Sequence, residues 1–357
     1  MEINQRPKLP EKPLPIAIIG AGGIIRDAHL PAYEKVGFPV LGVYDVNTEK
    51  AQEIKKTFNA VQRVYNSLDK LIAAASKENA VYDVAVPAKY ILDILQKIPH
   101  GSCILIQKPM GETLEEAKAI LKLCNEKNFV AGINFQLRYA PYMIAAKQII
   151  DQGLLGDIYD MEINVNVYTP WNLWDFLYAL PRMEILYHSI HYIDLIRSFL
   201  GMPEKVYART NKHPKMPALA STKTTMILDY GEFLQTRILT NHGHEFGLKH
   251  QSSFLKIEGT KGAIKIKIGL SLDYPKGRPP QFEYFILDKH TEWQEVPLIG
   301  GWFPDAFIGT MAELQNHYQD RSKPLPHGVA DAYKTMRLVE AAYQSSEFGG
   351  TLINSIQ

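Results

Sequence analysis

The sequence predicts a two-domain protein, in which an α/β domain with a parallel sheet precedes an α+β domain with a mostly antiparallel sheet. The length of 357 residues corresponds to about two domains, at roughly 150 residues each. Short apolar strands alternate with helical patterns in the first third of the chain, and two-residue periodicity dominates from Met161 onward. We place the first domain at residues 1–133 and the second at residues 134–357.

The first strand of the predicted parallel sheet is Ile16–Ile19, and it runs directly into Gly20, Ala21, Gly22 and Gly23. A helical pattern to Lys35 follows. Glycines permit a tight turn there and let the backbone approach a pyrophosphate, whose charge then lies at the helix N-terminus. Ile25 occupies the third glycine position of the usual dinucleotide fingerprint, so a tight turn without a ligand is the alternative interpretation.

Asp45 ends the second predicted strand, Val40–Tyr44. It lies 23 residues beyond Gly22, close to the spacing of the acid that binds the adenosine ribose in dinucleotide folds. The next residues are Val46 and Asn47, so a 2′-phosphate would meet a carboxylate without a counter-charge. This pattern favours NAD over NADP.

Further strand and helix patterns alternate along the first domain. Thr113 and Glu116 form a capping box at the start of one of the helices. Repeated βα units of this kind indicate a parallel sheet and strengthen the nucleotide-binding interpretation of the glycine turn. The predicted segments are Tyr82–Val86, Ile91–Lys97, Cys103–Ile106 and a helix from Thr113.

The second half has a different periodicity. Pro141 suits the first position of a helix that runs to about Gln152. Alternating apolar and polar residues then predict strands with one buried face and one solvent-exposed face. These strands are expected at 161–167, 222–229, 233–240, 254–258 and 263–268, and a final helix at about 332–343.

Composition excludes several classes of protein. The 39 basic and 38 acidic residues give a net charge of +1, so no general field attracts nucleic acid or an acidic membrane surface. Cys103 and Cys124 fall in apolar or helical patterns, which argues against a secreted disulfide framework. The polar, proline-rich start lacks a signal peptide, and no apolar run reaches 18 residues. We therefore expect a cytoplasmic protein with neither nucleic-acid nor membrane partners.

Several short motifs together carry a resemblance to a known family. They are Gly20–Gly23, His29-Leu-Pro31, Asp45, Gln107-Lys108-Pro109, Asn134, Arg138-Tyr-Ala-Pro141, His191-Tyr-Ile-Asp194 and Gly259-Thr-Lys-Gly262. Over residues 15–352 the chain resembles the Gfo/Idh/MocA family of sugar and cyclitol oxidoreductases. The resemblance implies an N-terminal Rossmann domain, then an α+β domain whose large, mostly antiparallel open sheet packs between subunits as a homodimer or homotetramer. It also implies NAD(P)-dependent hydride transfer at a polyol carbon.

Two positions depart from the family pattern. Gln107 replaces the glutamate of the usual Glu-Lys-Pro, and Tyr187 replaces the usual aspartate four residues before the catalytic histidine. Lys108 follows a strand end, where its amine could reach a substrate hydroxyl, and partial burial would lower its pKa toward a useful range. A surface lysine before a turn proline is the alternative.

A helix through residues 186–194 would place Tyr187, His188, His191 and Asp194 on one side. By resemblance His191 is the catalytic proton donor or acceptor, with Tyr187 as a neutral orienting partner. A satisfied core histidine is the alternative. The pair His188 and His191 could also be half of a metal site, completed by Asp194 or by a member of His242-Gly-His244. We expect no metal, because the histidines after Asn241 are more simply those of a solvated loop.

We predict an NAD-dependent dehydrogenase or reductase acting on a sugar, sugar acid or cyclitol. A catalytically silent NAD-binding regulator of the same fold is the alternative. The expected catalytic residues are Lys108, His191 and Tyr187. The expected cofactor-binding residues are Gly20, Gly22, Gly23, Ile24, Ile25, Asp45, Val86, Pro87, Gln107, Lys108 and Arg138. The expected substrate residues are Asn134, Trp171, His188, His191 and Trp302, with core packing as an alternative for the tryptophans.

Overall fold

The computed structural model describes residues 3–350, and the chain divides into two compact units. Unit 1 contains residues up to Ile144 together with Gly300–Met336, and unit 2 contains Ala145–Ile299 together with the chain from Arg337. Two of the three boundaries fall within helices, α6 (Pro141–Asp151) and α9 (Val329–Phe348), and the third lies between Ile299 and Gly300, outside any helix or strand. The domain boundary that we predicted between residues 133 and 134 lies inside unit 1. Unit 1 also includes the later segment Gly300–Met336.

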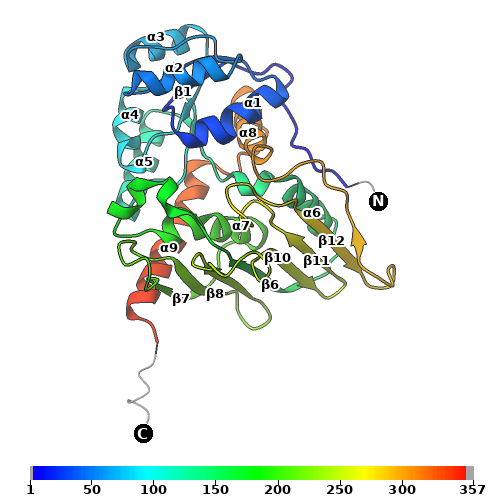
Figure 1. The fold of residues 1–357 in the computed structure, drawn as a ribbon. Coiled ribbons are helices and arrows are strands. Elements are labelled where there is room, and N and C mark those ends of the chain that lie inside the picture. The colour runs from blue at the N-terminus through cyan, green and yellow to red at the C-terminus, as the bar shows by residue number, and fades with distance from the viewer. Residues whose placement is uncertain (1–2, 351–357) are drawn as a thin grey trace. The chain divides into compact units, whose positions relative to one another are not determined.

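Unit 1 is built on a five-stranded parallel sheet of order β2-β1-β3-β4-β5. Figure 1 labels β1 of this sheet together with the helices α1 to α5 and α8 of the unit. The buried strands carry Ile, Val and Leu on both faces, as expected of a parallel sheet covered by helices. β2 and β3 lie on opposite sides of β1, so the strand order reverses there, and such a reversal is where ligands bind in α/β folds. The strands are β1 (Ile16–Ile19), β2 (Val40–Tyr44), β3 (Val81–Val84), β4 (Cys103–Ile106) and β5 (Val130–Ile133).

The helices of unit 1 begin where the sequence provides caps. Asn47 accepts hydrogen bonds from the first turn of α2, and Thr113 caps α5 by accepting from Glu116 N at 3.2 Å. After the glycine loop the chain enters a π-helical turn, Ile25–His29, before α1. The helices are α1 (Leu30–Val36), α2 (Thr48–Thr57), α3 (Leu68–Lys77), α4 (Ile91–Lys97), α5 (Leu114–Glu126) and α8 (Ala306–Gln319), with one-turn 3₁₀ helices at Ala88–Tyr90 and Gln136–Tyr139.

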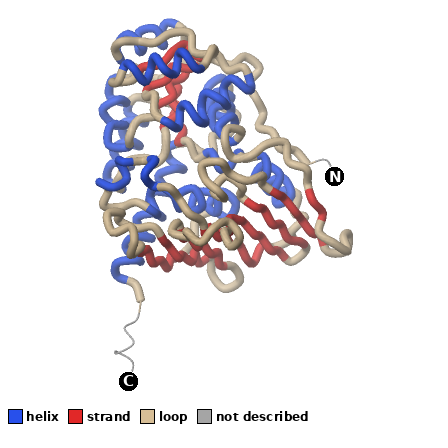
Figure 2. Tube along the Cα trace, in the orientation of Figure 1, coloured by secondary structure: helices blue, strands red, loops and turns tan. Residues whose placement is uncertain are grey.

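Unit 2 is built on an eight-stranded sheet of order β13-β12-β11-β10-β6-β9-β8-β7. Figure 2 colours the strands red, and Figure 1 labels β6, β7, β8, β10, β11 and β12 of this sheet. Among the strand pairs of this sheet only β6 and β9 are parallel, so the sheet is mostly antiparallel, as predicted. Alternate residues are buried beneath α7 (Ile190–Leu200), which packs on β9. The strands are β6 (Ile158–Asn166), β7 (Lys205–Asn211), β8 (Lys223–Asp229), β9 (Gln235–Asn241), β10 (Ser252–Gly259), β11 (Gly262–Lys267), β12 (Gln281–Ile286) and β13 (Gln294–Glu295).

A π-helical turn, Glu184–Ser189, leads directly into α7. The helix predicted through residues 186–194 is therefore present, but its first part is wound more loosely than an α-helix. π-turns of this kind often occur at functional sites. Short 3₁₀ turns at Trp171–Leu173 and Asp175–Ala179 precede it.

Both cysteines, Cys103 and Cys124, are buried free thiols. Burial raises the pKa of Cys124 to about 12, so it is an inert thiol. Among residues 3–350 no helix combines the length and the apolarity that crossing a bilayer requires.

Candidate functional site

The glycine loop of unit 1 is held by the carboxylate of Asp45. One oxygen accepts from Ala21 N and the other from Asn47 N, both at 2.7 Å. Gly20 has φ +107°, and a Cβ at this position would lie 2.4 Å from Ala85 O, directly after strand β3. The turn therefore requires glycine at position 20 for both its conformation and its packing.

The residues of this loop fit a dinucleotide. A Cβ built on Gly22 meets no atom within 4 Å, so the space above this glycine is open to a phosphate group. A backbone hydrogen bond of 3.1 Å from Ile25 N to Gly22 O closes the first helical turn, and amides that precede such a turn are donors for an anion. The Ile25 side chain is completely buried in the core of unit 1, while Ile24 packs at the edge of that core.

The remaining predicted cofactor residues lie at the same edge of the sheet. Half-buried Val86 and exposed Pro87 follow β3, and Gln107 and Lys108 follow β4. Because the carboxyl ends of parallel strands share one edge, these residues and Asp45 lie at the same carboxyl-terminal edge of the unit 1 sheet.

Lys108 is half-buried, and the peptide bond to Pro109 is cis. The Gln107 side-chain oxygen accepts from Lys108 N at 2.9 Å, so this glutamine supports the backbone of the turn. Burial lowers the pKa of the Lys108 ammonium from about 10.5 to about 8. A lysine with such a pKa can exchange a proton near neutral pH.

Two predicted residues are engaged inside unit 1. The Arg138 guanidinium donates to Pro326 O at 2.8 Å and to Asp331 at 3.1 Å. Asn134 is completely buried, and its amide lies 3.1 Å from His29 Nε2 while its oxygen accepts from Thr310 at 2.8 Å. Through these contacts both side chains stabilise the structure of unit 1 near the carboxyl-terminal edge of its sheet.

In unit 2, His191 lies in the first turn of α7 and is 7% exposed. Tyr187 lies one turn earlier, half-buried, with its ring 5.8 Å from that of Phe176 in an edge-to-face contact. Lys108 belongs to unit 1 and His191 to unit 2.

Glu184 is a residue that the sequence analysis missed. Its fully buried carboxylate accepts from Ser189 at 2.7 Å and from Thr224, and His242 Nε2 lies 3.3 Å from its Oε1. Burial alone would raise the pKa of this carboxyl, but the hydrogen bonds and the charge of His242 outweigh burial and hold the pKa below its usual value. The spacing Glu-x-x-x-His from Glu184 to His188 was the available signal.

The expectation that His242 belongs to a solvated loop is wrong, because His242 is completely buried. It directly follows β9, and its side chain meets Thr169 on one side and Glu184 on the other. His244, two residues on, is half-buried as the loop leaves the sheet.

The two tryptophans predicted as substrate residues are both buried. Trp171 is 5% exposed in a small apolar cluster and makes an edge contact with His188, at 6.5 Å between ring centroids. Trp302, in unit 1, is 6% exposed and packs beside Phe303.

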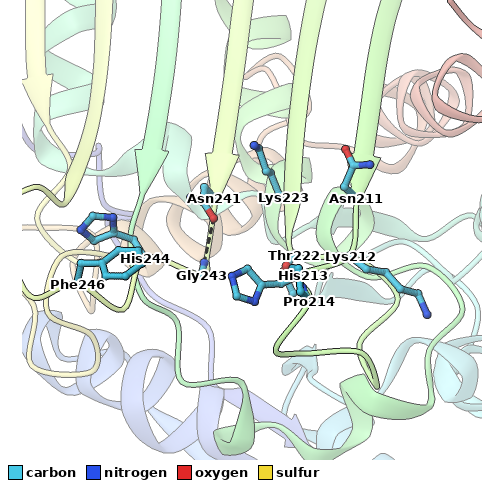
Figure 3. A pocket seen from close by; sticks show the side chains of 10 residues that line it. All are labelled: Asn211, Lys212, His213, Pro214, Thr222, Lys223, Asn241, Gly243, His244 and Phe246. Carbon is cyan, nitrogen blue, oxygen red and sulfur yellow. Dashed lines mark hydrogen bonds between the residues drawn. The ribbon is translucent and has the colours of Figure 1, made fainter.

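Figure 3 shows the residues that line a pocket in unit 2, where β7 and β9 end and β8 begins. The volume of this pocket is about 320 Å³. Its lining includes Lys212, Lys223 and His213, and the Asn241 side chain accepts from Gly243 N at 3.1 Å. Its ten lining residues, all within the described chain, do not include the histidine and tyrosine predicted as catalytic. This pocket is therefore distinct from the predicted site on α7.

Comparisons with known proteins cover both units. Residues 14–135 match the model of an oxidoreductase family described as an NAD-binding Rossmann fold, and residues 147–352 match the C-terminal alpha/beta domain of the same family. The chain is 25% identical to glucose-6-phosphate 3-dehydrogenase of Bacillus subtilis, over 77% of this chain and 75% of that protein. It is 23% identical to D-apiose dehydrogenase of Rhizobium rhizogenes, over 71% of this chain and 72% of that protein.

A solved structure has the same fold. It is an oxidoreductase from Agrobacterium radiobacter in complex with NAD⁺, L-tartaric acid and magnesium, with a TM-score of 0.76 and 21% identity over 97% of this chain and all of that one. The likeness confirms the predicted order of an α/β domain followed by an α+β domain.

Proposed function

The chain belongs to the Gfo/Idh/MocA family of oxidoreductases and carries its NAD-binding Rossmann domain, and from that premise we propose a specific reaction for it. The reaction is hydride transfer between NAD and a hydroxyl or keto carbon of a sugar, a sugar acid or a cyclitol. The names of the Bacillus and Rhizobium relatives, both sugar dehydrogenases, support this substrate class.

Gly20, Gly22 and Gly23 hold the pyrophosphate in this proposal, and Asp45 accepts hydrogen bonds from the ribose hydroxyls. The preference for NAD over NADP rests on the Asp45 carboxylate, which repels a 2′-phosphate. When bound, the nicotinamide supplies the hydride acceptor or donor. The residues that would flank the dinucleotide are Ile24, Ile25, Val86, Pro87, Gln107 and Arg138.

Lys108 carries the proposal, because its lowered pKa suits a group that holds and moves a proton. In the oxidative direction its neutral amine accepts the proton of the substrate hydroxyl. In the reductive direction its ammonium donates a proton to the forming alkoxide. Gln107 adds no carboxylate that would stabilise the ammonium, so the same low pKa is maintained.

His191 is proposed as a second proton carrier for a substrate hydroxyl, and Tyr187 as its orienting partner. His188, Trp171, Asn134 and Trp302 are proposed to shape the substrate pocket. For Asn134 and the tryptophans this action is through packing, since these side chains are buried.

A panel of polyols, sugars and sugar acids tests the function, with NADH absorbance followed above and below pH 8. Lys108→Met should abolish turnover while NAD binding persists. Lys122→Met is the matched control, because Lys122 lies on the surface of α5 in the same unit with 75% of its side chain exposed. Tight NAD binding with no turnover of any substrate by the parent protein would instead favour the silent regulator.

A homo-oligomer and a cytoplasmic location are further parts of the proposal. Exposed Tyr159 and Tyr207 on strands of the unit 2 sheet, with exposed Phe233 in the turn between β8 and β9, line a hollow of about 780 Å³, which supports burial against a second copy. The two unbridged thiols support a reducing compartment. Light scattering and cell fractionation test the two statements, and a monomer at micromolar concentration would contradict the first.

A further inference from the structure

The side chains of Glu184, His188 and His242 converge inside unit 2. Each offers one atom of a type that binds metal ions, and these atoms all lie within 4.8 Å of one another. Glu184 and His188 come from the π-helical turn before α7, and His242 comes from the end of β9. Two elements far apart in the sequence thus bring a carboxylate and two imidazoles to one place.

The distances in this cluster fit a coordination shell better than an ion pair. Glu184 Oε1 lies 3.3 Å from His242 Nε2 and 3.8 Å from His188 Nδ1. A charge-assisted hydrogen bond between such groups is about 2.7–2.9 Å long. A tetrahedral ion with bonds of roughly 2.0–2.2 Å instead sets neighbouring donor atoms about 3.4 Å apart.

The charges point the same way. A fully buried carboxylate requires a cation nearby. The two imidazole rings lie edge to face with their centroids 4.0 Å apart, so both rings approach the same carboxylate. An ion between the three side chains would neutralise the buried Glu184 carboxylate.

The surroundings also resemble those of a metal site. His242 Nδ1 lies 2.8 Å from the hydroxyl of Thr169, which can accept its proton and so direct Nε2 toward the ion. Ser189 and Thr224 hold the Glu184 carboxylate, and the Trp171 ring lies 5.1 Å from that of His242 as an apolar cover.

We propose that Glu184, His188 and His242 bind one divalent transition-metal ion of the zinc class. Two imidazoles favour such ions over magnesium and calcium, which prefer oxygen ligands. Three protein ligands leave one position of a four-coordinate ion open for water or for an oxygen of a small molecule. The His188 side chain is 22% exposed and gives that position a route to solvent. This site departs from the expectation of no metal, and it does not depend on hydride transfer.

Metal binding is measured directly on the full chain, after stripping with a chelator, by titration with Zn²⁺ and with Co²⁺. The parent protein should take up one ion per chain, and bound Co²⁺ should show the intense visible absorption of tetrahedral coordination. Mg²⁺ at the same concentration should not compete. The matched control is His244→Asn, two residues from His242 and outside the cluster, which should bind like the parent.

His188→Asn should lower the affinity at least about 100-fold, since loss of an outer-shell partner alone costs 10- to 100-fold. Thr169→Val should lower it by that smaller factor and serves as the second test should His188→Asn fail to fold by circular dichroism. Absence of stoichiometric Zn²⁺ or Co²⁺ binding by the parent would overturn the proposal. Parent-like affinity in folded His188→Asn, or in Thr169→Val if His188→Asn does not fold, would do the same.

Discussion

Replacing Lys108 with methionine should stabilise the protein while it abolishes activity. Methionine keeps the length and apolar character of the lysine stem and removes the charge. In the unfolded chain the ammonium titrates near pH 10.5, and in the folded protein near pH 8. The folded protein therefore carries the cost of a partly desolvated ammonium at neutral pH.

The size of this effect follows from the pKa difference. Each pKa unit corresponds to about 1.36 kcal/mol, so the shift corresponds to about 3 kcal/mol. Below pH 8 both states hold the proton and the full cost is present. Between pH 8 and 10.5 the unfolded chain binds more protons than the folded one, so this group's contribution to stability improves as the pH rises.

The assay is thermal unfolding of parent and Lys108→Met without NAD, over a series of pH values. At pH 7 the melting temperature of Lys108→Met should exceed that of the parent by roughly 6–12 °C, because each kcal/mol of stability changes the melting temperature of a domain of this size by about 2–4 °C. This difference in melting temperature should disappear as the pH approaches 10.5. The surface variant Lys122→Met should show no such dependence on pH. A variant that melts below the parent at pH 7, or a gap independent of pH, would refute the reasoning.

Three further outcomes are expected. Asp45→Ala should narrow the preference for NAD over NADP in fluorescence titrations, and equal affinities of the parent for both cofactors would contradict the role of this carboxylate. Gly22→Val should weaken NAD binding with an unchanged melting temperature, because a Cβ at position 22 meets open space. Gly20→Ala should instead destabilise the fold, because its Cβ would collide with Ala85 O. A Gly22→Val protein with the NAD affinity of the parent would argue against the phosphate site. His191→Ala should lower turnover by roughly 100- to 10,000-fold, and Tyr187→Phe should lower it less. Tyr187→Asp should move the pH optimum of turnover upward, because the new carboxylate stabilises the imidazolium form of His191. Superimposable pH profiles of parent and Tyr187→Asp would show that the tyrosine only packs.

Local signals were sufficient for much of the fold. The strand at Cys103–Ile106 and the helix at Ile91–Lys97 have the predicted bounds, and the hairpin at Gly259–Gly262 pairs Glu258 with Ala263. These features depend on apolar periodicity and turn glycines, which are readable within a few residues.

Other features depend on contacts between distant residues. Helix α8 was not predicted, because it is buried along most of its length and shows little amphipathic pattern. The burial of His242 depends on Thr169 and Glu184, which lie 73 and 58 residues away in sequence. A polar stretch after a strand gives no local sign that one of its histidines faces inward.

Helix α8 has a consequence for how the chain is made. Its residues Phe307, Met311 and Leu314 complete the core of unit 1, and Gln315 accepts from Leu14 N across 301 positions of sequence at 2.8 Å. A ribosome would therefore release nearly the entire polypeptide before the nucleotide-binding half could close. Until then the half-built unit exposes apolar surface that a chaperone could recognise. A fragment ending at Ile144 lacks helix α8. An isolated nucleotide-binding domain would therefore need residues 300–336 fused to that fragment.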